Sequence, residues 1–129
     1  MGRKIEVTAG SAVFEGATSP AKDQVEMLQI AAKCGLLPAI NDGVTDMGLL
    51  ASLAGIDYSS LNRLKELCLK NGCIVRQADN IPVAENLFQD EAHNYLVLIG
   101  KVLRENIGPF WQLRNEEGNG KKSSQIPQE

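Results

Sequence analysis

The chain has 129 residues, of which 43% are hydrophobic and 22% are charged, and its formal net charge is −3. This length suits one domain, and the hydrophobic fraction is high enough for a core, which excludes a fully disordered chain. No apolar run approaches the roughly 20 residues that a membrane-spanning helix needs, so we expect no membrane partner. The slightly acidic balance disfavours nucleic acid as a partner.

The first twenty residues predict a short extended segment or β-hairpin. Ile5 and Val7 alternate with polar residues, residues 9–11 can turn the chain, and residues 12–14 can return. Ser19 and Pro20 then indicate the start of a helix. We expect the Ser19 hydroxyl to accept a hydrogen bond from one of the first helical amides.

The helix that follows is apolar on more than one face. Met27 and Ile30 widen its apolar surface, and Gly35 ends it, with Pro38 just beyond. The residues on its clearest apolar face, at the spacing i, i+4, i+7 and i+11, are Ala21, Val25, Leu28 and Ala32. Such a helix is either buried on several sides or carries a partner surface. Met27 and Ile30 therefore belong either to the core or, as candidates, to a partner or self-association surface.

Two shorter helices and a second hairpin occupy the middle of the chain. Thr45 can cap a helix over residues 46–54, and Asp57 or Ser59 can cap another that continues to Lys70. Residues 73–76 and 81–83 read as a small hairpin, and Pro82 marks its second strand as an edge strand.

The clearest helical periodicity spans residues 90–106. Phe110 and Trp111 follow directly, and either close the core or anchor a partner. Residues 115–129 contain one large aliphatic side chain, Ile126, so we expect a disordered tail after a domain over residues 1–114. The predicted fold class is mainly α (α+β): a compact bundle of about four helices with two small extended units.

Cysteine and histidine usage points to no catalytic or metal site. The three cysteines, Cys34, Cys68 and Cys73, form no disulfide framework, and with His93 they lack the paired short spacings of zinc sites. Cys34 and Cys68 fall at apolar positions of predicted helices, which is typical of buried small side chains. We therefore expect no cofactor and no enzymatic activity.

Residues 46–83 leave a second interpretation open. Gly55 between two short apolar helices, followed by a hairpin, resembles a winged helix-turn-helix. In a DNA-binding regulator of this kind, the residues that would face the groove are Ser59, Ser60, Asn62 and Arg63. The charge of residues 57–76 is only slightly positive, which limits the number of phosphates that could be neutralised.

The order of elements over about residues 12–113 carries a family resemblance. The first helix has an apolar pattern that ends at Gly35 and Pro38, and residues 49–57 read Leu-Leu-x-x-Leu-Ala-Gly-Ile-Asp. Phe88 precedes the last helix, which ends with Asn106 and then Gly-Pro-Phe-Trp. This pattern resembles the small tail assembly chaperones of long-tailed, siphovirus-type double-stranded DNA bacteriophages.

The resemblance implies a non-enzymatic chaperone that binds the tape-measure protein, keeps it soluble and helps to recruit the major tail-tube protein. It also implies a homo-oligomer, and a longer form of the protein made by translational frameshifting. Residues 120–122, Gly-Lys-Lys, are a sequence that a purine-rich slippery run of codons can encode. Such a chaperone acts in the host bacterial cytoplasm and is not expected in the mature virion.

Overall fold

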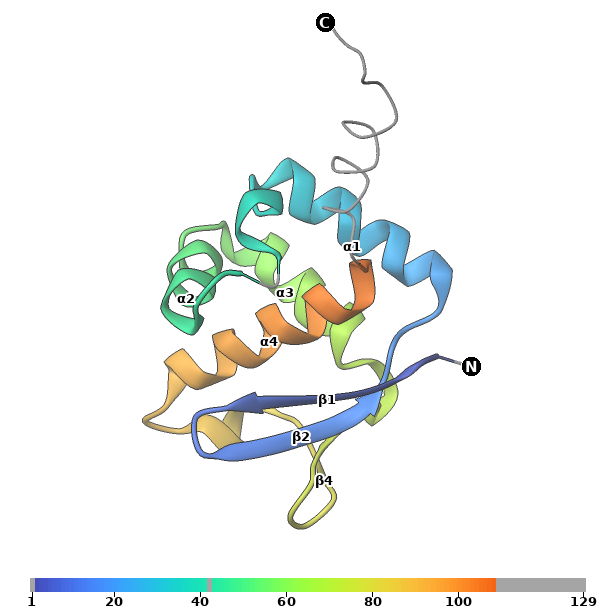
Figure 1. The fold of residues 1–129 in the computed structure, drawn as a ribbon, viewed down its shortest axis with the longest axis vertical. Coiled ribbons are helices and arrows are strands. Elements are labelled where there is room, and N and C mark those ends of the chain that lie inside the picture. The colour runs from blue at the N-terminus through green and yellow to red at the C-terminus, as the bar shows by residue number, and fades with distance from the viewer. Residues whose placement is uncertain (1, 42, 109–129) are drawn as a thin grey trace, which may run out of the picture.

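The computed structural model describes residues 2–41 and 43–108, which form four α-helices and one four-stranded antiparallel sheet (Figure 1). The predicted α+β fold class is confirmed. The strands are β1 (Lys4–Ala9), β2 (Ala12–Ala17), β3 (Ile74–Arg76) and β4 (Ile81–Pro82). The helices are α1 (Ala21–Lys33), α2 (Asp46–Ala54), α3 (Tyr58–Cys68) and α4 (Ala92–Ile107).

The two predicted hairpins form one sheet with the order β1-β2-β3-β4. They meet where β2 pairs with β3, and Glu15 lies opposite Val75. Pro82 lies in the edge strand β4, as expected for a residue without a backbone N–H. Side chains alternate along the strands, so one face of the sheet enters the core through Ile5, Val7, Ala9, Phe14 and Ile74.

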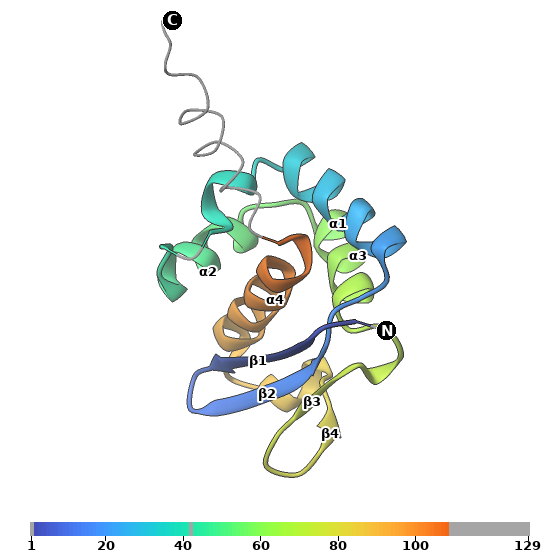
Figure 2. The same ribbon diagram turned by 45° about the vertical axis from the view of Figure 1, so that its right-hand side comes forward.

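Helix α4 is the centre of the domain, between the sheet and the other three helices (Figures 1 and 2). It packs on β1, α1, α2 and α3. Its fully buried side chains include Leu98, Ile99, Val102 and Leu103. In the part of the chain that the structure describes, no helix is both long enough and apolar enough to cross a membrane.

Local end signals place most helix termini as predicted. The Thr45 hydroxyl accepts a hydrogen bond from the Gly48 N–H at 3.1 Å, and the Asp57 carboxylate accepts one from the Ser60 N–H at 2.9 Å. Gly35, just past α1, has a φ of +74°, the left-handed conformation that glycine adopts most easily.

The prediction for Ser19 is wrong. Pro20 occupies the cap position of α1 and no side chain caps it. Ser19 is 6% exposed, and its hydroxyl instead donates to the carbonyl oxygen of Leu67 at 2.9 Å. Carbonyl groups in the last turn of a helix lack a partner within that helix. The Ser19 hydroxyl therefore supplies a hydrogen bond to a carbonyl in the last turn of α3.

Candidate interaction surface on helix α1

Helix α1 has two apolar faces, and only one of them is in the core. On the inner face, Met27 and Ala31 are 0% exposed. On a second face, Val25 is 58% exposed and Leu28 is 37% exposed. The exposed residues that share this second face, here called the outer stripe, are Ala21, Val25, Leu28 and Ala32.

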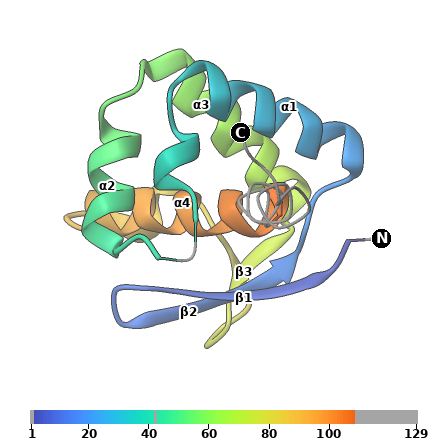
Figure 3. The same cartoon turned by 45° about the horizontal axis from the view of Figure 1, so that its top comes forward.

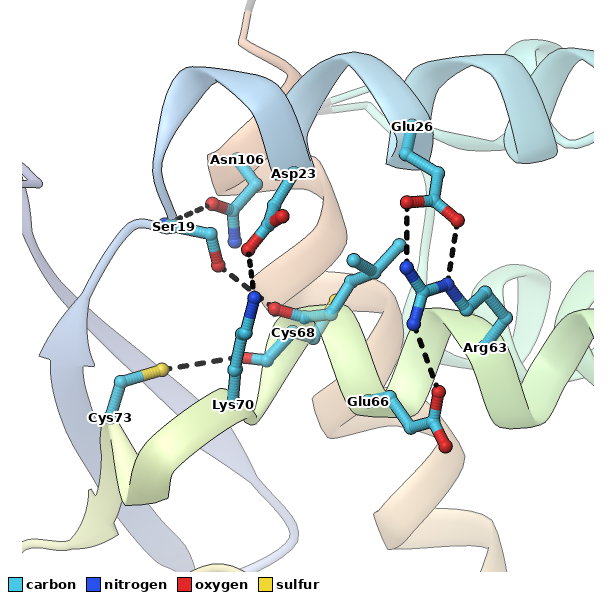
Figure 4. Close-up of polar contacts among 10 residues, drawn as sticks. Ser19, Asp23, Glu26, Arg63, Glu66, Cys68, Lys70, Cys73 and Asn106 are labelled. Carbon is cyan, nitrogen blue, oxygen red and sulfur yellow. Dashed lines mark hydrogen bonds and ion pairs between the residues drawn. The ribbon is translucent and has the colours of Figure 1, made fainter.

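A buried polar contact fixes the start of α1 (Figure 4). Asn106, 5% exposed on α4, accepts a hydrogen bond from the Ser19 N–H at 2.7 Å through Oδ1. Its Nδ2 donates to the Val102 carbonyl oxygen at 2.9 Å, which holds the amide group in this orientation. The contact joins the end of α4 to the segment that enters α1.

Ion pairs hold α1 beside α3, and Figure 3 shows the two helices side by side. The Arg63 guanidinium donates two hydrogen bonds to the Glu26 carboxylate, at 2.6 and 2.8 Å. These hydrogen bonds lower the pKa of Glu26. One turn earlier on α1, the buried carboxylate of Asp23 lies 3.3 Å from the ammonium group of Lys70 (Figure 4).

Both acidic side chains of α1 therefore form ion pairs, Glu26 with α3 and Asp23 with Lys70 just after α3, whereas its exposed lysines form none in the described residues. Within residues 2–41 and 43–108, neither Lys22 nor Lys33 forms an ion pair. A helix turns by about 100° per residue, which places Lys22, Gln29 and Lys33 along one side of the outer stripe. We call these three residues the lysine border.

The residues predicted for a partner surface have different outcomes. Met27 is 0% exposed and belongs to the hydrophobic core. Its side chain therefore cannot form an accessible surface in this fold. Ile30 is partly buried and packs against the core. Phe110 and Trp111 lie outside the described residues, as do residues 115–129.

The residues of the helix-turn-helix interpretation are mostly engaged within the chain. The Ser59 hydroxyl donates to Asp57 at 2.8 Å, and Arg63 pairs with Glu26 and with Glu66. Ser60 and Asn62 are partly buried. In addition, α2 packs mainly on α4, and α3 packs on α1 and α4, so the two helices do not form the close mutual pair of a helix-turn-helix.

The cysteines and the histidine do not converge in the described part of the chain. Cys68 is 0% exposed, and burial raises the pKa of its thiol well above the ordinary range. Its predicted place in the core is confirmed. Cys34 is partly buried just after α1, and His93 is exposed at the start of α4. Among residues 2–41 and 43–108, no group of His, Cys, Asp and Glu is arranged to hold a metal ion.

Sequence reasoning found the apolar excess of α1 but left open which of its faces lies in the core. The two faces carry apolar groups of similar size, so volume alone could not separate them. The available signal was charge: Lys22 and Lys33 lie closer around the helix to Val25 than to Met27, and lysines mark the solvent side of a helix.

Comparison of the chain with protein-family models, with curated proteins and with solved structures found no match. The outer stripe and its border are therefore the features from which a function is inferred.

Proposed function

We propose that this protein is a non-enzymatic tail assembly chaperone of a long-tailed bacteriophage. It binds the tape-measure protein, keeps it soluble and helps to recruit the major tail-tube protein. The single observation that supports this proposal is the outer stripe, where Val25 and Leu28 face solvent although α1 already fills the core from its other side. The order of elements in the sequence, described above, supplies the choice of partner.

An exposed apolar helix face suits a protein that covers apolar helices of another chain. Large apolar groups on a surface favour association, and helix recognition commonly uses apolar anchors at i, i+3, i+4 and i+7 spacing. Val25 and Leu28 stand at i and i+3. Because α1 is fixed at its start by Asn106 and along its side by Arg63, the stripe is already ordered before a partner arrives.

The remaining partners belong to the same proposal. The chaperone forms a homo-oligomer along the tape measure, acts together with a longer frameshifted form of itself, and works in the cytoplasm of the bacterial host. It is absent from the mature virion. The negative net charge of −3 favours solubility of the assembly.

Co-expression with the tape-measure protein encoded in the same tail gene cluster tests the proposal. The wild-type chain should keep the tape measure in the soluble fraction and co-purify with it, whereas Val25→Asp/Leu28→Asp should lose both effects. Met47→Asp is the control for an aspartate introduced at an exposed apolar position outside the stripe, since Met47 is 70% exposed on α2.

Circular dichroism of each variant shows that the fold is retained. A tape measure that remains insoluble beside the folded wild-type chain contradicts the proposal. Equal loss of binding in the Met47→Asp variant would show that the outer stripe is not the surface responsible.

A further inference from the structure

We propose that the outer stripe binds an amphipathic helix whose apolar face is bordered by acidic side chains. The proposal deepens the function given above, on which it rests for the nature of the partner, and it concerns the same surface. It follows from three properties of α1: the shape of the stripe, the charge beside it and the lack of free backbone groups.

The shape of the stripe matches another helix. From Ala21 to Ala32 it extends over eleven residue steps, or about 17 Å along the helix axis. Its exposed side chains form one row parallel to that axis. A second helix with apolar residues at three- and four-residue spacing presents a row of the same kind, so about three turns of it would cover the stripe.

An extended peptide fits this surface less well. The backbone N–H and C=O groups in the middle of α1 are hydrogen-bonded within the helix, so the stripe offers a strand no backbone partners. Peptides that bind in extended form take much of their affinity from such backbone hydrogen bonds. A helical partner satisfies its own backbone and needs only side-chain contacts.

The charge beside the stripe selects an acidic partner. Lys22 and Lys33 of the lysine border are exposed and carry no ion pair in the described part of the chain. On the other side of the stripe stands the neutral Gln24. This surface is therefore locally positive on a chain whose net charge is −3, and carboxylates on the partner would complement it.

A second copy of the same surface is a poor occupant. The acidic residues of α1 already form ion pairs, Glu26 with Arg63 of α3 and Asp23 with Lys70 just after α3, so a second α1 brings no free carboxylate to the interface. In an antiparallel pair of α1 helices, Lys22 of one copy would lie beside Lys33 of the other. The like charges would weaken that pairing.

Two designed peptides test the proposal without the tape measure. Each is a helix of about 18 residues, long enough to form in water, with the same row of leucines, bordered by glutamates in one peptide and by lysines in the other. Binding of each labelled peptide to the full chain is measured by fluorescence anisotropy. Wild type should bind the acidic peptide about tenfold more tightly, since two charge contacts change from attraction to repulsion.

Variants then assign the effect to α1. Lys22→Glu/Lys33→Glu should reverse the preference between the two peptides, and Leu28→Asp should abolish binding of both. Lys4→Glu is a control for the reversal of one exposed lysine outside α1, because Lys4 is exposed on β1, and it should leave the preference unchanged. Circular dichroism confirms that each variant is folded.

Equal affinity of wild type for the two peptides overturns the proposal. The proposal is also overturned if the chain dimerises with increasing concentration in sedimentation velocity and Leu28→Asp abolishes the dimer, because the occupant of the stripe would then be a second copy. The proposed function can fail separately. If the tape measure co-purifies equally well with the Lys22→Glu/Lys33→Glu variant, the acidic partner is refuted but the chaperone function is not. If the chain selects the acidic peptide but does not bind the tape measure, only the chaperone function is refuted.

Discussion

Replacement of Asn106 by alanine should destabilise the domain by about 2 kcal/mol, because it removes the buried acceptor that holds the start of α1. Asn106 Oδ1 lies 2.7 Å from the Ser19 nitrogen, and both residues are buried, at 5% and 6% exposure. Without this oxygen the Ser19 N–H has no partner and is shielded from water. A buried donor left in this way costs about 1–3 kcal/mol.

The two other hydrogen bonds of Asn106 add little to this estimate. The Gln24 side chain, which is partly buried, donates to Oδ1 over a long distance of 3.4 Å. The Nδ2 of Asn106 donates to the Val102 carbonyl oxygen, four residues earlier in the same helix, and that oxygen also accepts the ordinary helical bond. The loss of this contact leaves no buried group unsatisfied. For a domain of about 100 residues, 2 kcal/mol corresponds to a decrease in Tm of about 8–16 °C.

Urea unfolding followed by far-UV circular dichroism measures the effect. Asn94→Ala is the control on the same helix, since its Nδ2 donates at 2.9 Å to the exposed carboxylate of Glu91. This variant should lose less than about 0.5 kcal/mol. If Asn106→Ala loses no more than Asn94→Ala, the Ser19 contact does not hold α1 and the reasoning is refuted.

Three further predictions concern other parts of the domain. Gly100→Ala should destabilise it by about 1–3 kcal/mol in urea unfolding, because a Cβ there would lie 2.9 Å from Leu53 Cδ1, too close for the packed face between α2 and α4. Hydrogen bonds, first from the Ser59 hydroxyl, lower the pKa of Asp57 from 3.8 to about 2. Its ionised form therefore adds stability above pH 3.8 that is lost as the pH falls towards 2, and the stability difference between wild type and Asp57→Asn should close over this range. Iodoacetamide should modify Cys34 in the native protein but Cys68 only after unfolding, because Cys68 is buried and its thiol pKa is raised; peptide mass spectrometry distinguishes the two sites.

The features that the sequence predicts correctly are those encoded within a few residues. Thr45 and Asp57 cap the helices that follow them, and Gly35 adopts the left-handed conformation after α1. The regular spacing over residues 90–106 gives the central helix. Each of these depends on a side chain and a backbone group that are neighbours in the chain, so local chemistry is sufficient.

Features that depend on distant segments could not be predicted in the same way. The pairing of β2 with β3 joins residues about sixty positions apart, and strand propensity alone does not select a partner strand. Ser19 illustrates the same limit. Its sequence context favours capping, but the fold places the Leu67 carbonyl, 48 residues away, within reach of its hydroxyl. Residues 46–68 form two helices joined near Gly55, as predicted, yet each packs on α4.

The contacts that hold α1 in the fold lie on its inner face and sides, and its outer stripe takes no part in them. This arrangement is consistent with the proposed role of the outer stripe in binding a partner. The helix is held by Met27 in the core, by Asn106 at its start and by Arg63 along its side, and none of these contacts uses the outer stripe. Replacement of Val25, the more exposed of the two large residues of the stripe, by aspartate should therefore change the free energy of unfolding by less than about 1 kcal/mol. A residue that contributes little to folding and exposes apolar surface to water favours aggregation unless a partner covers it. The partner proposed above would cover Val25 and Leu28, and the lysine border would complement acidic side chains on it.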